Sequence, residues 1–302
     1  MVKKLISVAM ATYNGERFIA EQLDSIFSQT VLPDEIVISD DNSSDNTLKI
    51  IESYCNKGIR IILINNSQNQ GYRRNFYKAI KECSGDYVFL CDQDDIWEKN
   101  KIELMASQMQ SNKNILLLCS NLKTFYVENC ENKVHEKSFF SRKQLIKLDD
   151  YKNFVNTPRP GCTFCISKDL VNLYVENVDF SLFHDNLLWH LASINNGCFL
   201  LNKQLILYRR HSSNASNNKE NTMDKRLVSI KEQIKSIDYL LNKSKDIRIR
   251  QFLINQKKVF QKRFYYLEKK NLCALLSLIR YKEYYTSIRL WLVDLYYCIK
   301  VW

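Results

Sequence analysis

The sequence contains no run of about 20 uncharged apolar residues, although 45% of its 302 residues are hydrophobic, so no membrane-spanning helix is expected. The basic start and the short apolar stretch at residues 5–12 are too brief for a secretory signal peptide, and the stretch alternates as a strand does. With 25% charged residues, the composition is typical of an ordered globular protein with one large domain and an appendage.

Glycine is scarce, with six residues in the whole chain. Neither G-x-G-x-x-G nor G-x-x-x-x-G-K-[ST] occurs, which excludes the common dinucleotide-binding fingerprint and the P-loop. Gly15, Gly58, Gly71 and Gly85 fall at junctions between predicted strands and helices, where turns are needed.

A second C-x-x-C pair is also missing. Among ten cysteines, only Cys162 and Cys165 have this spacing, whereas a zinc site would need a second pair. A redox pair is one interpretation, but the strand-like setting favours buried thiols. Free buried cysteines are typical of a reducing cytosol.

The formal net charge of +11 is unevenly distributed. Residues 221–302 contain 18 Lys and Arg against 7 Asp and Glu, whereas the first 220 residues contain 26 of each. The chain is thus a neutral body with a basic tail piece. A nucleic-acid-binding module would explain this tail. However, the tail mixes Lys with Tyr and Leu at helical spacing and has no recognised nucleic-acid motif, so no nucleic-acid partner is expected.

Strand and helix patterns alternate through the first 120 residues, which predicts an α/β fold with a mostly parallel sheet. The predicted strands are 5–12, 34–40, 59–65, 86–92 and 114–120, and the predicted helices are 16–29, 44–55, 72–83 and 97–110. Further along, the pattern predicts loops or a short hairpin at 121–157, a strand at 159–167, a helix at 184–195, a pair of strands at 198–211, a polar linker at 212–221 and helices over 222–302.

Three aspartates, Asp92, Asp94 and Asp95, follow the fourth predicted strand within four positions. Crowded carboxylates repel one another unless a cation or several hydrogen-bond donors neutralise them. A D-x-D arrangement at a strand end suits Mg²⁺ or Mn²⁺, which takes oxygen ligands and leaves positions open for substrate phosphates. An acidic turn that caps the following helix is the alternative.

Other polar residues follow neighbouring strands at the edge where such sheets bind ligands. Asp40 and Asp41 are suited to accept hydrogen bonds from a ribose or a base, or to cap the next helix. Arg73 and Arg74 begin a helix and are suited to clamp phosphate, or to lie on a solvated face.

Two histidines and an aspartate stand out in the second half of the chain. His184 and Asp185 precede an apolar helix, and a carboxylate there is suited to accept a proton or simply to cap the helix. His211 is suited to ligate a metal through a neutral imidazole, although a histidine after a strand is more often ordinary.

In order and spacing, seven motifs resemble the family-2 glycosyltransferases, which are inverting enzymes with a GT-A fold. The likeness covers about residues 4–217 and is greatest to bacterial rhamnosyltransferase-like members that build cell-surface polysaccharides. The motifs are "SVAMATYNGERFIAEQLDSIFSQT", "DEIVISDDNSSDNT", "GYRRNF", "CSGDYVFLCDQDDIW", "PGCTF", "HDNLLWHLA" and "YRRHSSNAS".

The resemblance implies a role for each candidate residue. Asp185 would be the catalytic base, Gly161 would lie near the donor sugar, and Arg73 and Arg74 would approach the donor diphosphate. His184 stands where the family usually has an acidic residue. The base pocket would be lined by Thr12, Tyr13, Asn14, Glu16, Asp41 and Asp40. Ribose, metal or phosphate would be held by Asp92, Asp94, Asp95 and His211.

The implied reaction moves a sugar, rhamnose by likeness, from a dTDP- or UDP-sugar to a hydroxyl of a glycan or lipid-linked acceptor, with Mg²⁺ or Mn²⁺ as cofactor. A nucleotidyltransferase is the rival enzyme class, but "TYNGE" is not the basic glycine-rich loop that such an enzyme needs. We expect a GT-A catalytic domain over 1–217, with a nucleotide-sugar part at 1–120 and an acceptor part at 121–217, and a helical extension over 218–302.

Residues 271–302 combine Trp291, Trp302 and several tyrosines with Lys and Arg that interrupt the apolar runs. Such segments lie on a bilayer rather than cross it, and their basic residues attract anionic lipids. We therefore expect a cytoplasmic protein that is peripheral on the inner face of the cell membrane. The alternative is a helical pair that packs on the catalytic domain or on a second subunit of a homo-oligomer.

Overall fold

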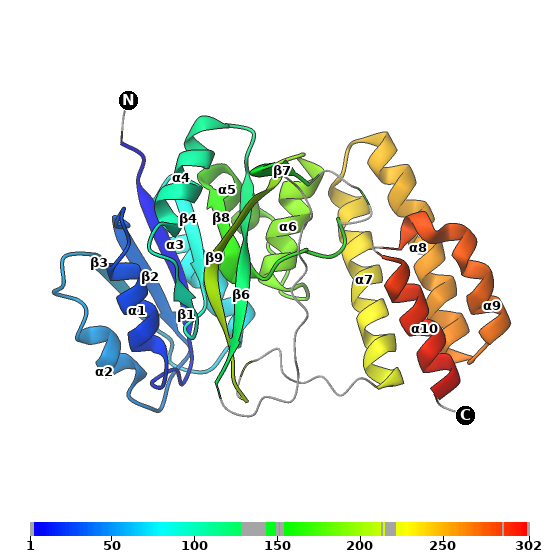
Figure 1. The fold of residues 1–302 in the computed structure, drawn as a ribbon, viewed down its shortest axis with the longest axis horizontal. Coiled ribbons are helices and arrows are strands. Elements are labelled where there is room, and N and C mark those ends of the chain that lie inside the picture. The colour runs from blue at the N-terminus through cyan, green and yellow to red at the C-terminus, as the bar shows by residue number, and fades with distance from the viewer. Residues whose placement is uncertain are drawn as a thin grey trace. The chain divides into compact units, whose positions relative to one another are not determined.

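The computed structural model describes residues 3–127, 143–148, 151, 154–212, 214, 222–285 and 287–300. The chain forms two compact units, each with its own core (Figure 1). The first unit consists of Met1–Leu148, Pro158–Ala192 and Asn196–Asn217. The second consists of Asp149–Thr157, Ser193–Asn195 and Asn218–Trp302.

One sheet forms the centre of the first unit. Over the described residues its strands run in the order β3-β2-β1-β4-β8-β6-β9-β5, and β7 pairs with β9. The strands are β1 (Ile6–Thr12), β2 (Glu35–Asp40), β3 (Arg60–Asn65), β4 (Tyr87–Cys91), β5 (Ile96–Trp97), β6 (Leu117–Tyr126), β7 (Leu145–Lys147), β8 (Phe164–Ser167) and β9 (Cys198–Arg210).

The first four strands are all parallel, as the alternation predicts. Thr12 pairs with Asp40, and Asp40 pairs with Asn65, so the carboxyl ends of β1, β2 and β3 lie level with one another. Met10 pairs with Cys91 at the end of β4. The polar residues that follow these four strands therefore gather at one edge of the sheet.

The rest of the sheet is mixed, because β8 runs antiparallel to both β4 and β6, while β5 and β7 run antiparallel to β9. The predicted pair of strands at 198–211 is wrong, since β9 is a single strand parallel to β6. The polar residues Asn202 and Lys203 lie opposite a shift in register between Ser120 and Asn121. The loops or short hairpin predicted at 121–157 begin later than expected, because β6 continues to Tyr126 and pairs with β9 over this length.

Five helices of the first unit follow the predicted pattern with shorter bounds, whereas the helix Lys168–Glu176 was not predicted. The predicted helix at 97–110 begins only at Lys101, because Ile96 and Trp97 pair with β9 as β5. The helices are α1 (Ile19–Phe27), α2 (Thr47–Glu52), α3 (Tyr72–Glu82), α4 (Lys101–Ser111), η2 (Gly161–Thr163), α5 (Lys168–Glu176) and α6 (His184–Ile194).

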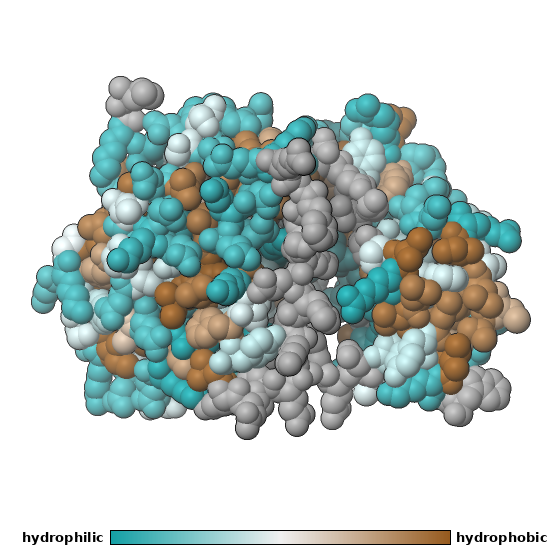
Figure 2. All heavy atoms as spheres, in the orientation of Figure 1, coloured by the Kyte–Doolittle hydropathy of each residue, from teal (hydrophilic) through white to brown (hydrophobic). Residues whose placement is uncertain are grey.

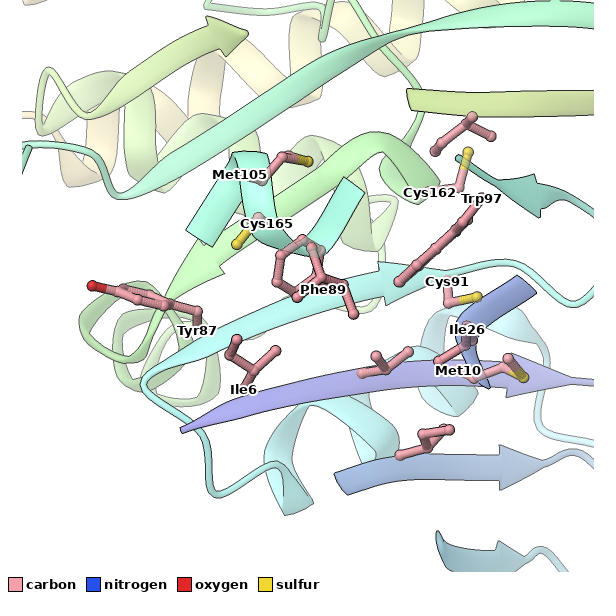
Figure 3. Close-up of a cluster of buried hydrophobic side chains, with 14 of the residues drawn as sticks. Ile6, Met10, Ile26, Tyr87, Phe89, Cys91, Trp97, Met105, Cys162 and Cys165 are labelled. Atoms are coloured by element: carbon pink, nitrogen blue, oxygen red, sulfur yellow. The ribbon is translucent and has the colours of Figure 1, made fainter. Parts of the chain in front are cut away.

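The main core of this unit packs strand side chains against α1 and α4. Figure 3 shows part of it, including Phe89 of β4 and Trp97, whose ring centroids are 5.9 Å apart. Cys162 and Cys165 belong to the same core as free, buried cysteines, which confirms the expectation of buried thiols.

The second unit is helical, as predicted, and also includes Phe154 and Val155, which are buried in its core. Its helices are α7 (Met223–Lys243), α8 (Ile247–Glu268), α9 (Leu272–Ser277), η4 (Leu278–Tyr284) and α10 (Ile288–Lys300). Within the described residues, every helix falls short of the length or hydropathy that would let it cross a membrane.

Apart from Val259, the buried side chains of α8 recur at alternating steps of four and three, which turns one face of the helix toward the core. Two of these positions are polar, Gln256 and Arg263. Gln256 Nε2 donates to the carbonyl of Tyr284 at 3.0 Å. Arg263 Nη2 donates to Asp294 Oδ1 at 3.0 Å, and Arg226 Nε donates to the same oxygen at 2.8 Å. One fully buried carboxylate therefore neutralises two arginines.

Asp294 lies on the buried face of α10, and the opposite face of this helix is apolar and exposed. Ile288, Leu292, Tyr296 and Ile299 follow one another at helical spacing and are each 51% to 56% exposed. We call these four residues the α10 face. Figure 2 shows apolar side chains gathered over this part of the second unit. Large contiguous apolar surface of this kind usually marks an interaction site.

The stability of the second unit depends on Asp294, because its carboxylate is the buried counter-charge of two arginines. Asp294→Asn leaves two arginines without a counter-charge and should lower the free energy of unfolding by about 3 kcal/mol or more. The measurement is urea denaturation of the full chain followed by circular dichroism. The control is Asp238→Asn, which removes an exposed pair with Lys257 and should cost at most about 1 kcal/mol. Equal effects of the two variants would contradict the assigned role of Asp294.

Candidate active site

The loop after β1 is joined by hydrogen bonds to the loop after β2. Asn14 has a positive φ of 46°, and its Oδ1 accepts from the Ser44 N–H at 2.9 Å. Glu16 Oε2 accepts from the Asn46 N–H at 2.9 Å. Tyr13, between these anchors, leaves 47% of its surface exposed. The two loops therefore form one frame that presents Tyr13 to solvent.

Asp40 and Asp41 are both buried at the base of this frame. Asp40 Oδ2 accepts from Thr12 Oγ1 at 2.7 Å and from Ser43 Oγ at 2.6 Å. Asp41 accepts from the N–H groups of Gln70 and Gly71, at 2.9 Å and 2.8 Å. Both carboxylates thus hold the loops that follow β1, β2 and β3 in this structure.

Gln93 connects this frame to the carboxylate turn, which we define as residues 92–95. The Tyr13 N–H donates to Gln93 Oε1 at 2.9 Å, and Gln93 Nε2 donates to the Tyr13 carbonyl at 3.0 Å. A Cβ on Gly15 would lie 2.4 Å from Gln93 Oε1, so any side chain at this position would displace the Gln93 amide. We call this reciprocal pair of hydrogen bonds the Gln93 bracket.

Within the carboxylate turn, Asp94 faces the segment that follows β9. Asp94 Oδ2 lies 2.8 Å from His211 Nε2 and accepts from Asn214 Nδ2 at 2.9 Å. The His211 ring is also packed 4.6 Å from the ring of Phe18. The structure therefore brings together Asp94 and His211, two residues that the sequence suggests as metal ligands.

Asp95 points inward and is fully buried. Its Oδ1 accepts from the Arg209 N–H at 3.0 Å, while Oδ2 has no hydrogen-bond partner within the described part of the chain. The Arg209 guanidinium donates to the Asp94 carbonyl at 2.7 Å and pairs with Glu21 at 2.7 Å. Arg209 thus holds the carboxylate turn through its backbone and its side chain.

Lys101 lies buried near the same turn. Its ammonium donates to the Cys162 carbonyl at 3.0 Å and lies 4.3 Å from the centre of the Trp97 ring. Burial lowers the pKa of Lys101 to about 8, so the group remains mostly protonated at pH 7. This buried positive charge acts on Asp92 and Asp95 and favours their ionised forms.

The carboxylate turn is electrostatically costly without a cation. Burial, followed by the charges of Asp94 and Asp185, raises the pKa of Asp92 to about 7. Burial, followed by the charges of Asp94 and Asp92, raises the pKa of Asp95 well above its usual value. Ligand atoms of Asp92, Asp95 and Cys162 lie within 4.8 Å of one another. Burial also raises the pKa of Cys162, so it stays a thiol, which is a poor ligand for a hard cation.

Asp185 lies in the first turn of α6, close enough to Asp92 to raise its pKa. A Cβ on Gly161 would lie 3.1 Å from the Asp185 Cβ and 3.2 Å from His184 Nε2, so glycine keeps this approach open. His184 stacks on Phe76 with ring centroids 4.0 Å apart, and burial lowers its pKa. His184 is therefore an uncharged side chain packed beside Asp185.

Arg73 and Arg74 both reach the segment that leads into α6. Arg73 Nη1 donates to the carbonyls of Phe180 and Ser181, at 3.0 Å and 2.8 Å. The Arg74 guanidinium lies 4.2 Å from the centre of the Phe180 ring. In this structure both side chains contact the segment before Asp185.

Three residues of this site were missed from the sequence: Gln93, Lys101 and Arg209. Gln93 lies between two of the predicted ligands, and Arg209 lies two residues before His211, so proximity to the motifs was a usable signal. Lys101 has no such signal, because it reads as an ordinary charge at the start of a helix.

Comparisons with known proteins agree on one family. The family model described as glycosyl transferase family 2 matches residues 7–173. The dTDP-rhamnosyl transferase RfbG of Shigella flexneri is 36% identical over 219 residues, which cover 68% of this chain and 72% of RfbG. The UDP-Glc:alpha-D-GlcNAc-diphosphoundecaprenol beta-1,3-glucosyltransferase WfgD of Escherichia coli is 29% identical over 225 residues, which cover 71% of this chain and 81% of WfgD.

A solved structure shows the same fold. The S. aureus TarS fragment 1–349 in complex with UDP-GlcNAc superimposes with a TM-score of 0.66 at 19% identity. The match covers 91% of this chain and 81% of that chain.

The raised pKa of Asp92 predicts a pH-dependent effect of Asp92→Asn on stability. A carboxyl whose pKa rises from 3.8 to about 7 on folding stabilises the folded state below pH 3.8, and this contribution is lost as the pH rises through about 7. Asparagine is always neutral. Without added cation, Asp92→Asn should therefore be more stable than the wild type, and this difference should increase between pH 4 and pH 8. Urea denaturation across this range measures it.

The control for this series is Asp86→Asn. A hydrogen bond from Lys4 lowers the pKa of Asp86, so its contribution is present at neutral pH and is lost as the pH falls. This variant should be less stable than the wild type at pH 8 and approach it in acid. A stability difference for Asp92→Asn that does not change with pH would show that Asp92 is not destabilised by its surroundings.

Proposed function

The chain belongs to glycosyl transferase family 2, and we propose that it is an inverting, divalent-cation-dependent enzyme of cell-surface polysaccharide synthesis. It moves a sugar from a dTDP- or UDP-sugar to a hydroxyl of a glycan or lipid-linked acceptor. The observation that carries this proposal is the convergence of Asp92, Asp94 and Asp185 beside Gly161 at the carboxyl edge of the sheet. The name of RfbG supports rhamnose as the sugar.

The donor nucleotide is held by the frame after β1 and β2. The exposed ring of Tyr13 is available to stack on the base, while Thr12, Asn14, Glu16, Asp40 and Asp41 fix the surrounding loops. We assign Arg73 and Arg74 to the donor diphosphate, because both contact the segment before Asp185 and a guanidinium pairs well with phosphate oxygens.

The residues of the carboxylate turn fit Mg²⁺ or Mn²⁺. Their donors are hard oxygens, and one of them, Asp95 Oδ2, is buried without a hydrogen-bond partner among the described residues. Asp92 and Asp94 would hold the cation, with Asp95 behind them and His211 beside Asp94. When bound, the cation neutralises charge on the departing diphosphate.

Asp185 is the general base of the proposed reaction. Its carboxylate takes the proton of the acceptor hydroxyl, and the acceptor oxygen forms a bond to the anomeric carbon of the donor sugar. The bond between this carbon and the diphosphate oxygen breaks, and its electron pair leaves with the diphosphate. Attack opposite the leaving group inverts the configuration. Gly161 and the neutral His184 leave room for the sugar beside the base.

The decisive variant is Asp185→Asn. A general base acts in the transition state, so kcat should fall about 100-fold or more, while affinity for UDP or dTDP, measured by calorimetry, changes little. The assay is sugar transfer with a panel of nucleotide sugars, with anomeric configuration read by NMR. Asp179→Asn, in the same segment but before α6, is the control and should keep full activity. Equal loss of binding and turnover in Asp185→Asn would show that Asp185 only caps the helix α6 and is not the general base.

Two arms of the same assay test the rest of the proposal. Excess chelator, and separately Asp94→Asn, should each remove most of the activity, and Mn²⁺ should restore only the chelated wild type. Full turnover in chelator would contradict the cation, and retained configuration in the product would contradict inversion.

We also propose that the enzyme is cytoplasmic and is attached to the inner face of the cell membrane through the α10 face. This proposal is supported by four half-exposed apolar side chains on one helix face and by Arg289 and Lys300 on the same helix. Apolar burial and attraction to anionic lipids act together in such helices.

Vesicle co-sedimentation tests this attachment. The wild type should pellet with anionic vesicles at low salt, and the double variant Leu292→Glu, Ile299→Glu should stay in the supernatant. Ile247→Glu changes a more exposed apolar residue outside the α10 face and serves as the matched control. If the wild type does not pellet, the α10 face instead covers a protein surface.

A further inference from the structure

A cavity of about 470 Å³ lies in the first unit beside α3 and β3. This volume is within the range of small-molecule sites. Its apolar lining comes from Ile62 and Ile64 of β3, from Tyr77 of α3 and from Phe180. The sheet order ends at β3, so this strand has no neighbour on its outer side within the described residues.

The alternation of side chains along β3 explains the apolar lining. Ile61 and Leu63 pack against the main core of the first unit. Successive side chains point to opposite faces of a strand, so Ile62 and Ile64 face away from that core and stay partly exposed. The result is apolar surface inside an open cavity.

Three cations line the same cavity: Arg74, Lys78 and Lys81. They are spaced by four and three residues on α3 and therefore share one helix face. None of them has an ion-pair partner among the described residues, and Lys78 donates only to the neutral Asn66 Oδ1, at 2.6 Å. Glu82 is the one carboxylate in the lining. Like charges at this spacing destabilise a helix, so an anionic ligand would relieve the repulsion.

The cavity adjoins both halves of the proposed active site. Gln70 lines it, and the Gln70 N–H donates to Asp41 in the frame assigned to the nucleotide. Phe180 also lines it, and its carbonyl accepts from Arg73 in the segment that leads to Asp185. A ligand here would therefore lie beside the segment that leads to the general base.

We propose that this cavity binds the phosphate-bearing, apolar part of the acceptor, which is a phosphate or diphosphate ester of a hydrocarbon chain. Lys78 and Lys81 bind the phosphate oxygens, while Arg74 stays with the donor diphosphate. Ile62, Ile64 and Phe180 contact the first part of the chain. This inference rests on the proposed function, because it assigns the cavity to the acceptor of that reaction. It narrows the acceptor class from any glycan to a lipid-linked one.

The test is direct binding with saturating UDP and Mg²⁺ present, which occupies the donor site. The probes are farnesyl diphosphate, inorganic diphosphate and farnesol, each titrated into the full chain by calorimetry. Farnesyl diphosphate should bind at least about tenfold more tightly than either of the others, because only it presents both charge and chain. Its affinity should also weaken as salt is added.

The informative variant is Lys81→Glu. Lys81 is exposed and has no hydrogen bond to the loops of the site, so its reversal leaves the fold intact. It should weaken farnesyl diphosphate binding about tenfold. Lys113→Glu reverses a cation of the same unit outside the cavity and should bind as the wild type does. A second variant, Ile62→Gln, should weaken farnesyl diphosphate binding and leave inorganic diphosphate binding unchanged.

Each remaining outcome overturns the inference. Equal affinity for inorganic and farnesyl diphosphate would make this a simple anion site. Binding of farnesyl diphosphate that is seen only when UDP is left out would place it in the donor site, and equal affinities for Lys81→Glu and Lys113→Glu would place it elsewhere. None of these measurements needs turnover, so failure of the sugar-transfer assay alone would contradict the proposed function and not the binding site.

Discussion

The repulsion among three carboxylates at the end of β4 is the constraint on which the site depends. The chain separates these groups by giving each a different environment. Asp95 turns inward to a backbone N–H of Arg209, and Asp94 turns to His211 and Asn214. Asp92 stays close to Asp94 and Asp185 and has a pKa raised to about 7. Lys101 supplies a fixed positive charge from inside the protein, where water cannot screen it.

The loops around this turn are supported from below by other buried carboxylates. Asp40 and Asp41 accept hydrogen bonds from the segments after β1, β2 and β3, whose carboxyl ends the parallel register places level with one another. Because these acids are occupied by protein donors, they hold the frame in shape and leave Tyr13 exposed as its outermost group. The parallel half of the sheet thus builds the frame around Tyr13, and the mixed half adds the segments that carry Gly161, Asp185 and His211.

Much of this arrangement could be predicted from the sequence, because it depends on local periodicity. The strands β1 to β4 alternate clearly, and parallel strands bring their carboxyl ends to one edge, so the gathering of Asp41 and Asp92 could be expected. The unpredicted contacts join residues far apart in the chain. Arg209 meets Asp95 across 114 positions, and no local pattern encodes such a contact. The long β9 was predicted as two strands, because Asn202, Lys203 and Gln204 interrupt its apolar pattern and only the pairing with β6 shows that the strand continues.

The Gln93 bracket determines at which stage the loops of the site lose their conformational entropy. The backbone of Tyr13 and the carboxylate turn are tied by two hydrogen bonds from one side chain, and Gly15 packs against it without a gap. These loops lose their conformational freedom when the chain folds rather than when a ligand arrives. A ligand that meets loops already ordered keeps more of its contact free energy as affinity. The entropy lost in ordering these loops therefore lowers the free energy of unfolding and not the affinity for the ligand.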